Sequence, residues 1–304
     1  MLFVDREQLF AVPLLSAAAD LAAVNAAGLQ DVADSTLVWW RSAVGRLARH
    51  VGDLRVDVVS PQVVHDWHRS IGAGASAVTA NSYLRAVGCV FSRLVRAGVL
   101  ADSPVRYVAY LPEPAADPKG VEEATYLAMR DAADCARDLA MVDALWATGC
   151  RLSGLLSMTT DRLEFWRAGD ELRMAAFVIE KFSKSRYVYA RSPQADSVLA
   201  WLEERPGGLG HDAVWVSVGR RARNRPLSRG GAEHALRRLR LRAGISRDEP
   251  AFAHSFRHAF GIRMLDGGHD LAAVSAWLGH SDPAFTARVY VNRREKELRR
   301  KFFG

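Results

Sequence analysis

The sequence reads His254-Ser255-Phe256-Arg257-His258 and, one helix later, Leu278-Gly279-His280-Ser281-Asp282. Phe256, Phe260 and Met264 recur at helical spacing, so they predict the core face of a helix over residues 255–266. The histidines and the arginine of the first segment share another face of that helix. A further helix is predicted over 271–278. The two segments therefore belong to helices that bring imidazole and guanidinium groups together, a combination that suits a phosphate.

A basic stretch precedes these helices. It contains ten arginines between residues 220 and 247, among which Glu233 is the acidic neighbour in sequence. With a net charge of +7 and a pI near 9.6, this distribution indicates a polyanionic partner, because neutralising phosphates releases counterions. A solvated charged face is the alternative. The residues expected to contact DNA are Lys184, Arg186, Arg223, Arg225, Arg237, Arg238, Arg240 and His258.

Upstream again, short β-prone runs between residues 163 and 189 are divided at 168–170 and 182–185, and they predict a small antiparallel sheet. The second division carries Lys181 and Lys184, two of only five lysines in the chain. An ammonium group, unlike a guanidinium, can give a proton to a leaving group, which suggests a chemical task for a lysine here. Ordinary exposure of a hairpin tip explains the lysines equally well.

Two further candidates lie at helix boundaries. Helices near 121–134 and 137–148 lead to Gly149, and Arg151 then begins a new helix from which its guanidinium can point into a cleft. At the other end of the chain, a last helix begins at Asp282-Pro283 and carries Tyr290. Taken singly, Arg151 would be a surface arginine and Tyr290 a packing aromatic.

The N-terminal third reads as a helical bundle. Asp34 or Ser35 can cap one helix, Ser60-Pro61 opens a second, and a third runs from about Asn81 to Gly98. The proline-rich segment at 111–118 cannot continue a helix and predicts a linker. We therefore expect a helical domain over 1–112, a linker over 113–119 and a second domain with a C-terminal tail over 120–304.

Cys89, Cys135 and Cys150 have no metal-knuckle spacing and are read as buried thiols. A zinc site built from the histidines at 254, 258 and 280 is disfavoured because Arg257 would oppose the cation, so no metal is expected. The sequence has no run of about 18 apolar residues, and charged residues precede its first apolar segment. We therefore expect a cytoplasmic protein without a membrane partner.

Together these segments resemble the tyrosine recombinase, or phage integrase, family, over roughly residues 120–292 and more loosely over the N-terminal helices. The resemblance implies a mainly α fold with a small antiparallel β-sheet. It further implies an N-terminal helical core-binding (SAM-like) domain, an α+β catalytic domain, and a two-domain architecture similar to the Xer recombinases.

The resemblance also implies a catalytic set, which is Arg151, Lys181, His254, Arg257, His280 and Tyr290. The two arginines would clamp the scissile phosphate, and the lysine would protonate the leaving 5′ oxygen. One histidine, His254, would assist proton transfer from the tyrosine, while His280 would hydrogen-bond the phosphate. Tyr290 would attack to give a 3′-phosphotyrosyl link, without a metal or nucleotide cofactor.

The implied partner is double-stranded DNA with a specific recombination site, bound by a homotetramer whose subunits are monomers when free, in the nucleoid of the cytoplasm. One departure from the family pattern concerns Gly154, which stands where an acidic residue often supports the first arginine, so that support must come from elsewhere. Two alternatives remain: a non-catalytic protein with helix-turn-helix-like DNA binding, and a nicking-resealing enzyme similar to type IB topoisomerases or telomere resolvases.

Overall fold

The computed structural model describes residues 12–24, 32–114, 119–180, 184–219, 222–279 and 302–303. The chain divides into two compact units, Met1–Ala115 and Ala116–Gly304. Within the described residues, no helix combines the length and the hydrophobicity needed to cross a bilayer. Each unit has its own hydrophobic core, as two domains of ordinary size should.

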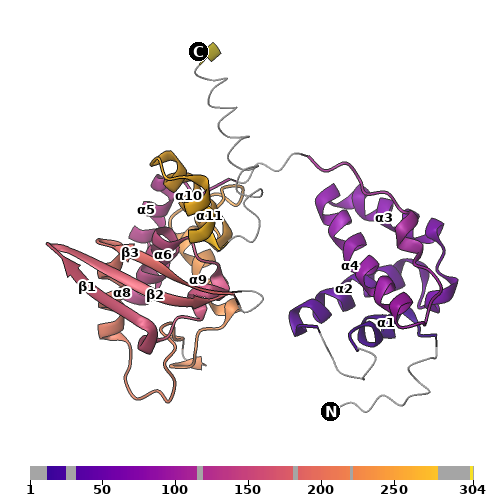
Figure 1. Cartoon of the computed structure of the whole chain (residues 1–304), viewed down its shortest axis with the longest axis horizontal. Helices are drawn as coiled ribbons and strands as arrows, with labels where there is room; N and C mark the ends of the chain where they lie inside the picture. The colour runs from indigo at the N-terminus through magenta and orange to yellow at the C-terminus, as the bar shows by residue number, and fades with distance from the viewer. Residues whose placement is uncertain are drawn as a thin grey trace. The chain divides into compact units, whose positions relative to one another are not determined.

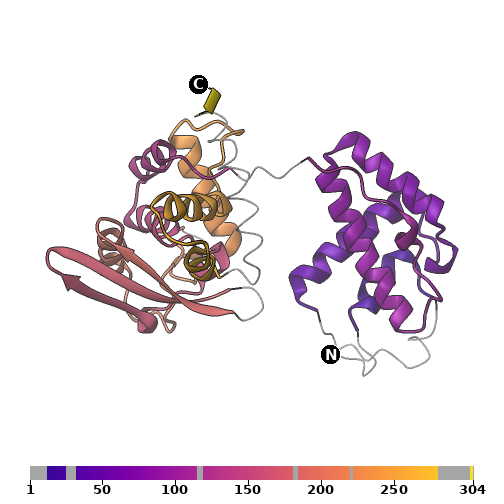
Figure 2. The same cartoon turned by 45° about the horizontal axis from the view of Figure 1, so that its top comes forward.

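The first unit is a helical bundle (Figure 2). Its elements are α1 (Leu15–Ala22), α2 (Asp34–Val51), η1 (Val56–Val58), α3 (Pro61–Gly74), α4 (Ala77–Arg96) and η2 (Pro104–Tyr107). Trp67, Leu84 and Phe91 are among the fully buried side chains at its centre. These residues lie on the apolar stripes of α3 and α4, so the bundle forms because each helix has one face to bury.

Helix starts in this unit follow their capping side chains. The predicted opening at Ser60-Pro61 is confirmed, since the Ser60 hydroxyl accepts the N–H of Val63. The next helix begins before the predicted Asn81, because Ser76 accepts the N–H of Thr79 and caps it at Ala77. The predicted cap at Asp34 or Ser35 is wrong: α2 starts at Asp34, after an Ala33 cap that makes no side-chain hydrogen bond.

The second unit combines a small sheet with a larger group of helices (Figure 1). Its elements are α5 (Glu123–Asp131), α6 (Ala136–Thr148), α7 (Leu152–Leu156), η3 (Thr160–Arg162), β1 (Leu163–Ala168), β2 (Glu171–Ile179), β3 (Ser185–Arg191), α8 (Gln194–Glu204), α9 (Arg229–Arg242), α10 (Ala253–Asp266) and α11 (Leu271–Leu278). The fold is therefore mainly α with a small antiparallel sheet, as predicted.

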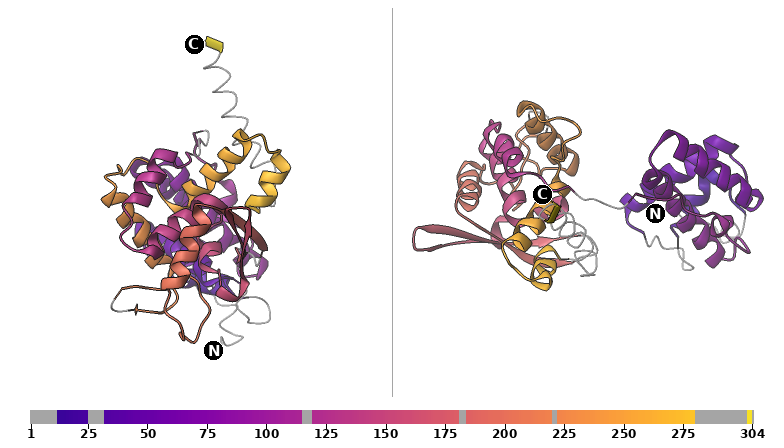
Figure 3. Two further views of the ribbon diagram at one scale, coloured as in Figure 1. Left: turned by 90° about the vertical axis from the view of Figure 1, so that its left-hand side faces the viewer. Right: turned by 90° about the horizontal axis from the view of Figure 1, so that it is seen from above.

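The three strands are antiparallel in the order β1-β2-β3. The β1–β2 turn at Gly169 and Asp170 projects from the unit (Figures 1 and 3). Alternate residues of β2, including Met174 and Val178, are buried together with Val188 of β3, and this face packs on α6 and α8. The β-prone stretch predicted between the divisions at 168–170 and 182–185 forms one continuous strand, β2. Helix α8 was not predicted.

Helix α6 is the central element of the second unit, because it contacts α5, α7, α8, α9, α10 and β3. Nearly every residue of it is buried, including the polar residues Arg137, Asp138 and Asp143. Trp146 stacks on Tyr126 of α5, with ring centroids 4.3 Å apart and planes 5° from parallel. Since α6 is held on all sides, its C-terminal end is a rigid place from which to position a functional group.

Candidate active site

Arg151 lies where α6 ends and α7 begins. The stop at Gly149 is confirmed: this residue is in the left-handed region, with φ of 59°, and a Cβ there would lie 2.6 Å from the Phe260 ring. Only glycine fits both the backbone conformation and the close approach of α10. Two residues later Arg151 is the N-cap of α7, in extended conformation, so its side chain extends from a fixed position between the two helices.

Arg257 extends from α10 toward the same junction of α6 and α7. Its side chain is almost fully buried, with 2% of the residue exposed. One terminal nitrogen, Nη1, donates to the carbonyl of Gly149 (3.1 Å), and the other, Nη2, donates to the carbonyl of Leu278. Both acceptors are carbonyls at helix C-termini, which carry partial negative charge. The predicted arginine pair is therefore brought together from segments 106 residues apart.

A carboxylate that the sequence analysis did not assign joins the two arginines. Glu180 follows β2, and only 2% of its side chain is exposed. Its Oε1 accepts the backbone N–H of Arg151 (2.8 Å) and lies 3.8 Å from Nη1 of Arg257, while its Oε2 pairs with the guanidinium of Arg151. The one sequence signal for it was indirect, since Gly154 leaves Arg151 without an acid nearby in the chain.

Arg186 is the third guanidinium of the cluster. It was predicted as a DNA contact, and its place on the inner face of β3 puts its Nη2 3.1 Å from Oε1 of Glu180. Its Nε and Nη1 are buried and make no hydrogen bond within the described part of the chain. Gly279, in the left-handed region at the end of α11, leaves room for it: a Cβ there would lie 2.8 Å from Nε of Arg186.

The charges of this arginine–glutamate cluster (Arg151, Arg186, Arg257 and Glu180) do not cancel. Burial alone would raise the pKa of Glu180, but the N–H of Arg151 and the three guanidinium groups outweigh it and lower the pKa below its usual range. Burial and the positive charge of Arg151 lower the pKa of Arg257 to about 10, so it stays charged at neutral pH. Three cations and one anion leave a net charge of +2, which favours an anionic ligand.

His254 and His258 lie one turn apart on α10, with ring centroids 4.5 Å apart and nearly perpendicular planes. Burial, followed by the positive charges of Arg257 and Arg151, lowers the pKa of His254. Burial, His254 and Arg257 lower the pKa of His258 to about 4. Both rings are therefore neutral at pH 7, and the predicted DNA contact at His258 would be a hydrogen bond without charge.

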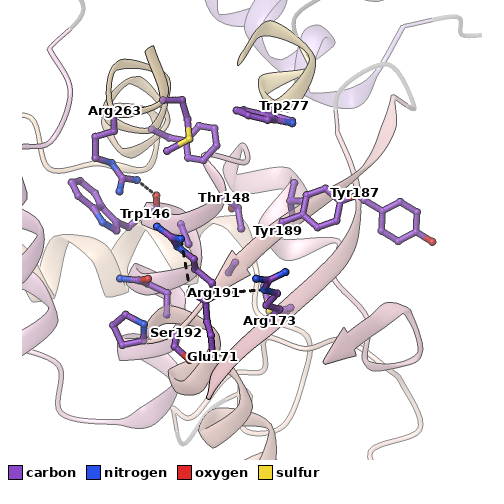
Figure 4. A pocket seen from close by; sticks show the side chains of 18 of the residues that line it. Trp146, Thr148, Glu171, Arg173, Tyr187, Tyr189, Arg191, Ser192, Arg263 and Trp277 are labelled. Atoms are coloured by element: carbon purple, nitrogen blue, oxygen red, sulfur yellow. Dashed lines mark hydrogen bonds and ion pairs between the residues drawn. The ribbon is translucent and has the colours of Figure 1, made fainter. Parts of the chain in front are cut away.

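A cleft of about 740 Å³ lies beside the arginine–glutamate cluster, between the edge of β3 and helices α10 and α11. Figure 4 shows Tyr187 and Tyr189 on its sheet side and Trp277 on its helix side. The guanidinium carbon of Arg263 lies 3.7 Å from the ring centroid of Trp146, and Nη2 of Arg263 donates to the Trp146 carbonyl. Of the residues predicted from sequence as functional, the cleft is lined by Arg186 alone within the described chain.

A second group of arginines is arranged differently. Arg238 pairs with Asp134 and with buried Asp138, Arg242 pairs with Asp134, and Arg137 donates to Asp138 from Nε (2.8 Å) and Nη2 (2.5 Å). Glu233 pairs with Arg229, as its place in the basic stretch suggests, but two carboxylates from outside the stretch, Asp134 before α6 and Asp138 within it, also meet its arginines. Arg238 has a structural role that the sequence did not reveal.

The other residues predicted to contact DNA differ in exposure. Lys184, Arg223, Arg225 and Arg237 are exposed, whereas Arg240 is half-buried. Lys184 lies just before β3, where its carbonyl accepts the N–H of Glu180 (2.8 Å). The predicted catalytic residues Lys181, His280 and Tyr290 lie outside the described residues.

One group of potential metal ligands occurs in the described residues: Asp134, Cys135 and Asp138, whose ligand atoms lie within 4.8 Å of one another. Both carboxylates are already engaged by the guanidinium groups of Arg238 and its neighbours. Burial also raises the pKa of the Cys135 thiol, so the thiolate form that binds metals is disfavoured. A cation would therefore have to displace arginines, and these residues do not suit one.

Known proteins resemble this chain in sequence. Residues 119–297 match the phage integrase family. The chain is 28% identical to the tyrosine recombinase XerD of Yersinia pestis over 287 residues, which cover 89% of this chain and 90% of the relative. It is 36% identical to XerD of Chlorobaculum tepidum over 153 residues, 48% of this chain and 45% of that relative.

Solved structures share the fold. A lambda integrase dimer bound to a COC′ core site has a TM-score of 0.68 at 16% identity, covering 91% of this chain and 77% of the other. XerH recombinase in a post-cleavage complex with a palindromic difH substrate has a TM-score of 0.69 at 16% identity, covering 87% and 78%. Because the family match spans more than half of the sequence and contains the whole arginine–glutamate cluster, this chain belongs to the phage integrase family of tyrosine recombinases.

Proposed function

We propose that this chain is a site-specific DNA recombinase that cuts and rejoins strands through a covalent bond between Tyr290 and a backbone phosphate. The observation that carries the proposal is that Arg151 and Arg257, predicted from separate segments, meet in one positively charged cluster whose arginines also act on His254. The relatives named XerD and the DNA-bound structures of lambda integrase and XerH support it.

The chemistry is a transfer of the phosphoryl group between two oxygens. The phenol of Tyr290 loses its proton and attacks phosphorus, the bond from phosphorus to the 5′ oxygen breaks, and Lys181 gives that oxygen a proton. The products are a 3′-phosphotyrosyl ester and a free 5′ hydroxyl. The ester replaces one phosphodiester bond by a bond of similar energy, so rejoining needs no nucleotide cofactor. Phenols ionise near pH 10, so the attack requires a base and nearby cations.

The described residues supply those cations and a base. Arg151 and Arg257 would hold the two non-bridging oxygens, and their fixed charge stabilises the phosphorane as negative charge builds on it. Arg186, with two donors free within the described chain, lies beside them. His254, neutral because burial and the arginines lower its pKa, can accept the tyrosine proton. His280 would donate a further hydrogen bond to the phosphate.

The proposed partner is double-stranded DNA carrying a specific recombination site. The exposed side chains of Lys184, Arg223, Arg225 and Arg237 are proposed to bind the backbone outside the reacting phosphate, together with the first unit as a core DNA-binding domain. Four subunits would assemble on two DNA sites and separate into monomers when free. A lambda integrase tetramer bound to a Holliday junction shares the fold, with a TM-score of 0.67. Such a substrate would place the protein at the nucleoid, in the cytoplasm.

A nicked DNA substrate tests the proposal, because it loses a short fragment after cleavage and so traps the covalent intermediate. Wild-type protein should form an adduct that survives denaturing electrophoresis, while Tyr290→Phe should bind the same DNA and form none. Tyr187→Phe, which removes an exposed phenol on β3, is the matched control and should form the adduct normally. An adduct with Tyr290→Phe, or none with wild-type protein on its own site, would refute the proposal.

A further inference from the structure

Position 154 and the side chain of Glu180 compete for the same space. Gly154 lies in α7, one turn after Arg151. A Cβ built on it would lie 3.0 Å from Cγ and 3.1 Å from Oε1 of Glu180. Any larger side chain at 154 would therefore have to displace the carboxylate. Conversely, an acid on 154 in a protein without the Glu180 side chain would place its carboxylate in the volume that Glu180 now fills.

The carboxylate of Glu180 touches every cation of the cluster. It accepts the backbone N–H of Arg151, pairs with the guanidinium groups of Arg151 and Arg186, and lies 3.8 Å from Arg257. Without it, three guanidinium groups would face one another with no anion among them in the described chain, and they would move apart. Arg151 depends on it most, since Glu180 binds both its backbone and its side chain.

The same residue also closes the β2–β3 turn. The N–H of Glu180 donates to the carbonyl of Lys184 over 2.8 Å, directly beyond the last pair of the ladder, Ile179 with Ser185. Lys181, the proposed proton donor, is the next residue in the chain. Glu180 thus connects the turn that carries the proposed acid to the two arginines that would hold the phosphate.

We propose that Glu180 is the positioning residue for Arg151 and Arg257, and that it supplies from the hairpin the carboxylate for which Gly154 leaves room in α7. This inference rests on the proposed function, because it concerns how the reacting phosphate is held. Glu180 itself does not touch the DNA: its carboxylate would repel a phosphate, and it acts through the guanidinium groups that separate the two anions.

The test moves the carboxylate from one position to the other. Four full-length variants are compared with wild type: Glu180→Gln, Glu180→Ala, Gly154→Asp and the double variant Gly154→Asp/Glu180→Ala. The measurements are the rate of adduct formation on saturating nicked DNA, the affinity for that DNA and the thermal melting curve. Glu171→Gln is the matched control, since Glu171 also pairs with two arginines, Arg173 of β2 and Arg191 of β3, but at the opposite end of β2 from Glu180.

We expect Glu180→Gln and Glu180→Ala to slow adduct formation by about 10- to 100-fold, the usual effect of removing a group that orients a ligand-binding side chain, while DNA affinity changes little. Gly154→Asp alone should also be slow, because two carboxylates would crowd one site. The double variant should be at least about tenfold faster than Glu180→Ala, a non-additive recovery that marks a direct interaction. Glu171→Gln should react at the wild-type rate.

The measurements distinguish failure of the proposed function from failure of the positioning role. A wild-type protein that forms no adduct refutes the proposed function, whereas an active wild type with an equally fast Glu180→Gln refutes only the positioning role. If the double variant restores the melting temperature of Glu180→Ala but not its reaction rate, the carboxylate serves only the fold and the inference is wrong. Recovery of the rate at an unchanged melting temperature supports it.

Discussion

The second unit contains two arginine groups built on buried carboxylates, and they differ in charge balance. In the first, Asp138 and Asp134 of the α6 region share three guanidinium groups, and Arg137 also donates to the carbonyl of Val216. In the second, the arginine–glutamate cluster, a single carboxylate faces three guanidinium groups. The first group therefore has a net charge of +1 and the second a net charge of +2, so the second is the better site for an anionic ligand.

Exposure does not separate the two groups. Each contains a buried arginine, Arg137 in the first and Arg257 in the second, and a partly exposed one, Arg238 (39% of the side chain) and Arg151 (34%). The charge left over around the carboxylates is therefore a stronger sign of a phosphate site than exposure. Removing a member of each group should affect a different property of the protein.

The largest expected effect is on stability, in the group built on Asp134 and Asp138. Asp138→Ala should lower the free energy of unfolding by about 3 to 5 kcal/mol, because it leaves the buried guanidinium of Arg137 without its carboxylate. Urea denaturation of the full-length protein measures this. Glu233→Ala is the control, since it breaks an exposed pair with Arg229 and should cost about 0 to 1 kcal/mol. Equal losses from the two substitutions would contradict the assignment of a structural network.

The next effect is on chemistry, at the arginine–glutamate cluster. Arg257→Ala should slow adduct formation by about 100- to 1,000-fold, as when a donor that stabilises developing charge is lost. Its contacts with the phosphate strengthen as charge builds, so DNA affinity should fall much less. Gel-shift titration and single-turnover cleavage on the same DNA separate the two quantities. Equal losses of affinity and rate would leave Arg257 with a positioning role only.

The smallest expected effect is a displacement of the pH profile. Burial, Arg257 and Arg151 lower the pKa of His254, so its neutral, proton-accepting form persists below the usual value of about 6.5. The second-order rate constant of cleavage, which reports the free protein, should therefore have an acidic limb whose midpoint lies below about pH 6.5. His254→Gln should abolish this acidic limb. A limb centred above pH 6.5 would contradict the assignment of His254 as the base.

Much of the fold was accessible from local patterns. Apolar spacing located α10, the Ser60-Pro61 opening predicted α3, the stop at Gly149 ended α6, and β-prone runs divided near Gly169 predicted the sheet. These signals act within a few residues of one another. The missed helices α1 and α8 carry neither end signal: Leu14 and Pro193 make no capping side-chain hydrogen bond, and their C-caps are Ala23 and Arg205, not glycine.

The candidate site was predicted in part. Arg151 lies at the helix boundary expected for it, Arg257 lies on the predicted helix near residues 255–266, and the two meet at Glu180 close to His254. Glu180 was given no role, and Arg186 was placed among the residues expected to contact DNA. The roles of both residues depend on which side chains of the β2–β3 hairpin face inward. The strand register and the packing of α6 decide this.

By itself the sequence determined the kinds of group available: arginines, histidines, a rare lysine pair and a tyrosine, in an order and at helix and strand ends that specify a recombinase. Only the tertiary structure decided which arginine meets which carboxylate, because ion pairs depend on distance in space and not on separation along the chain. Asp138 lies 100 residues from Arg238, and Glu180 lies 29 residues from Arg151. The fold alone makes the first pairing part of a structural network and the second part of the candidate site.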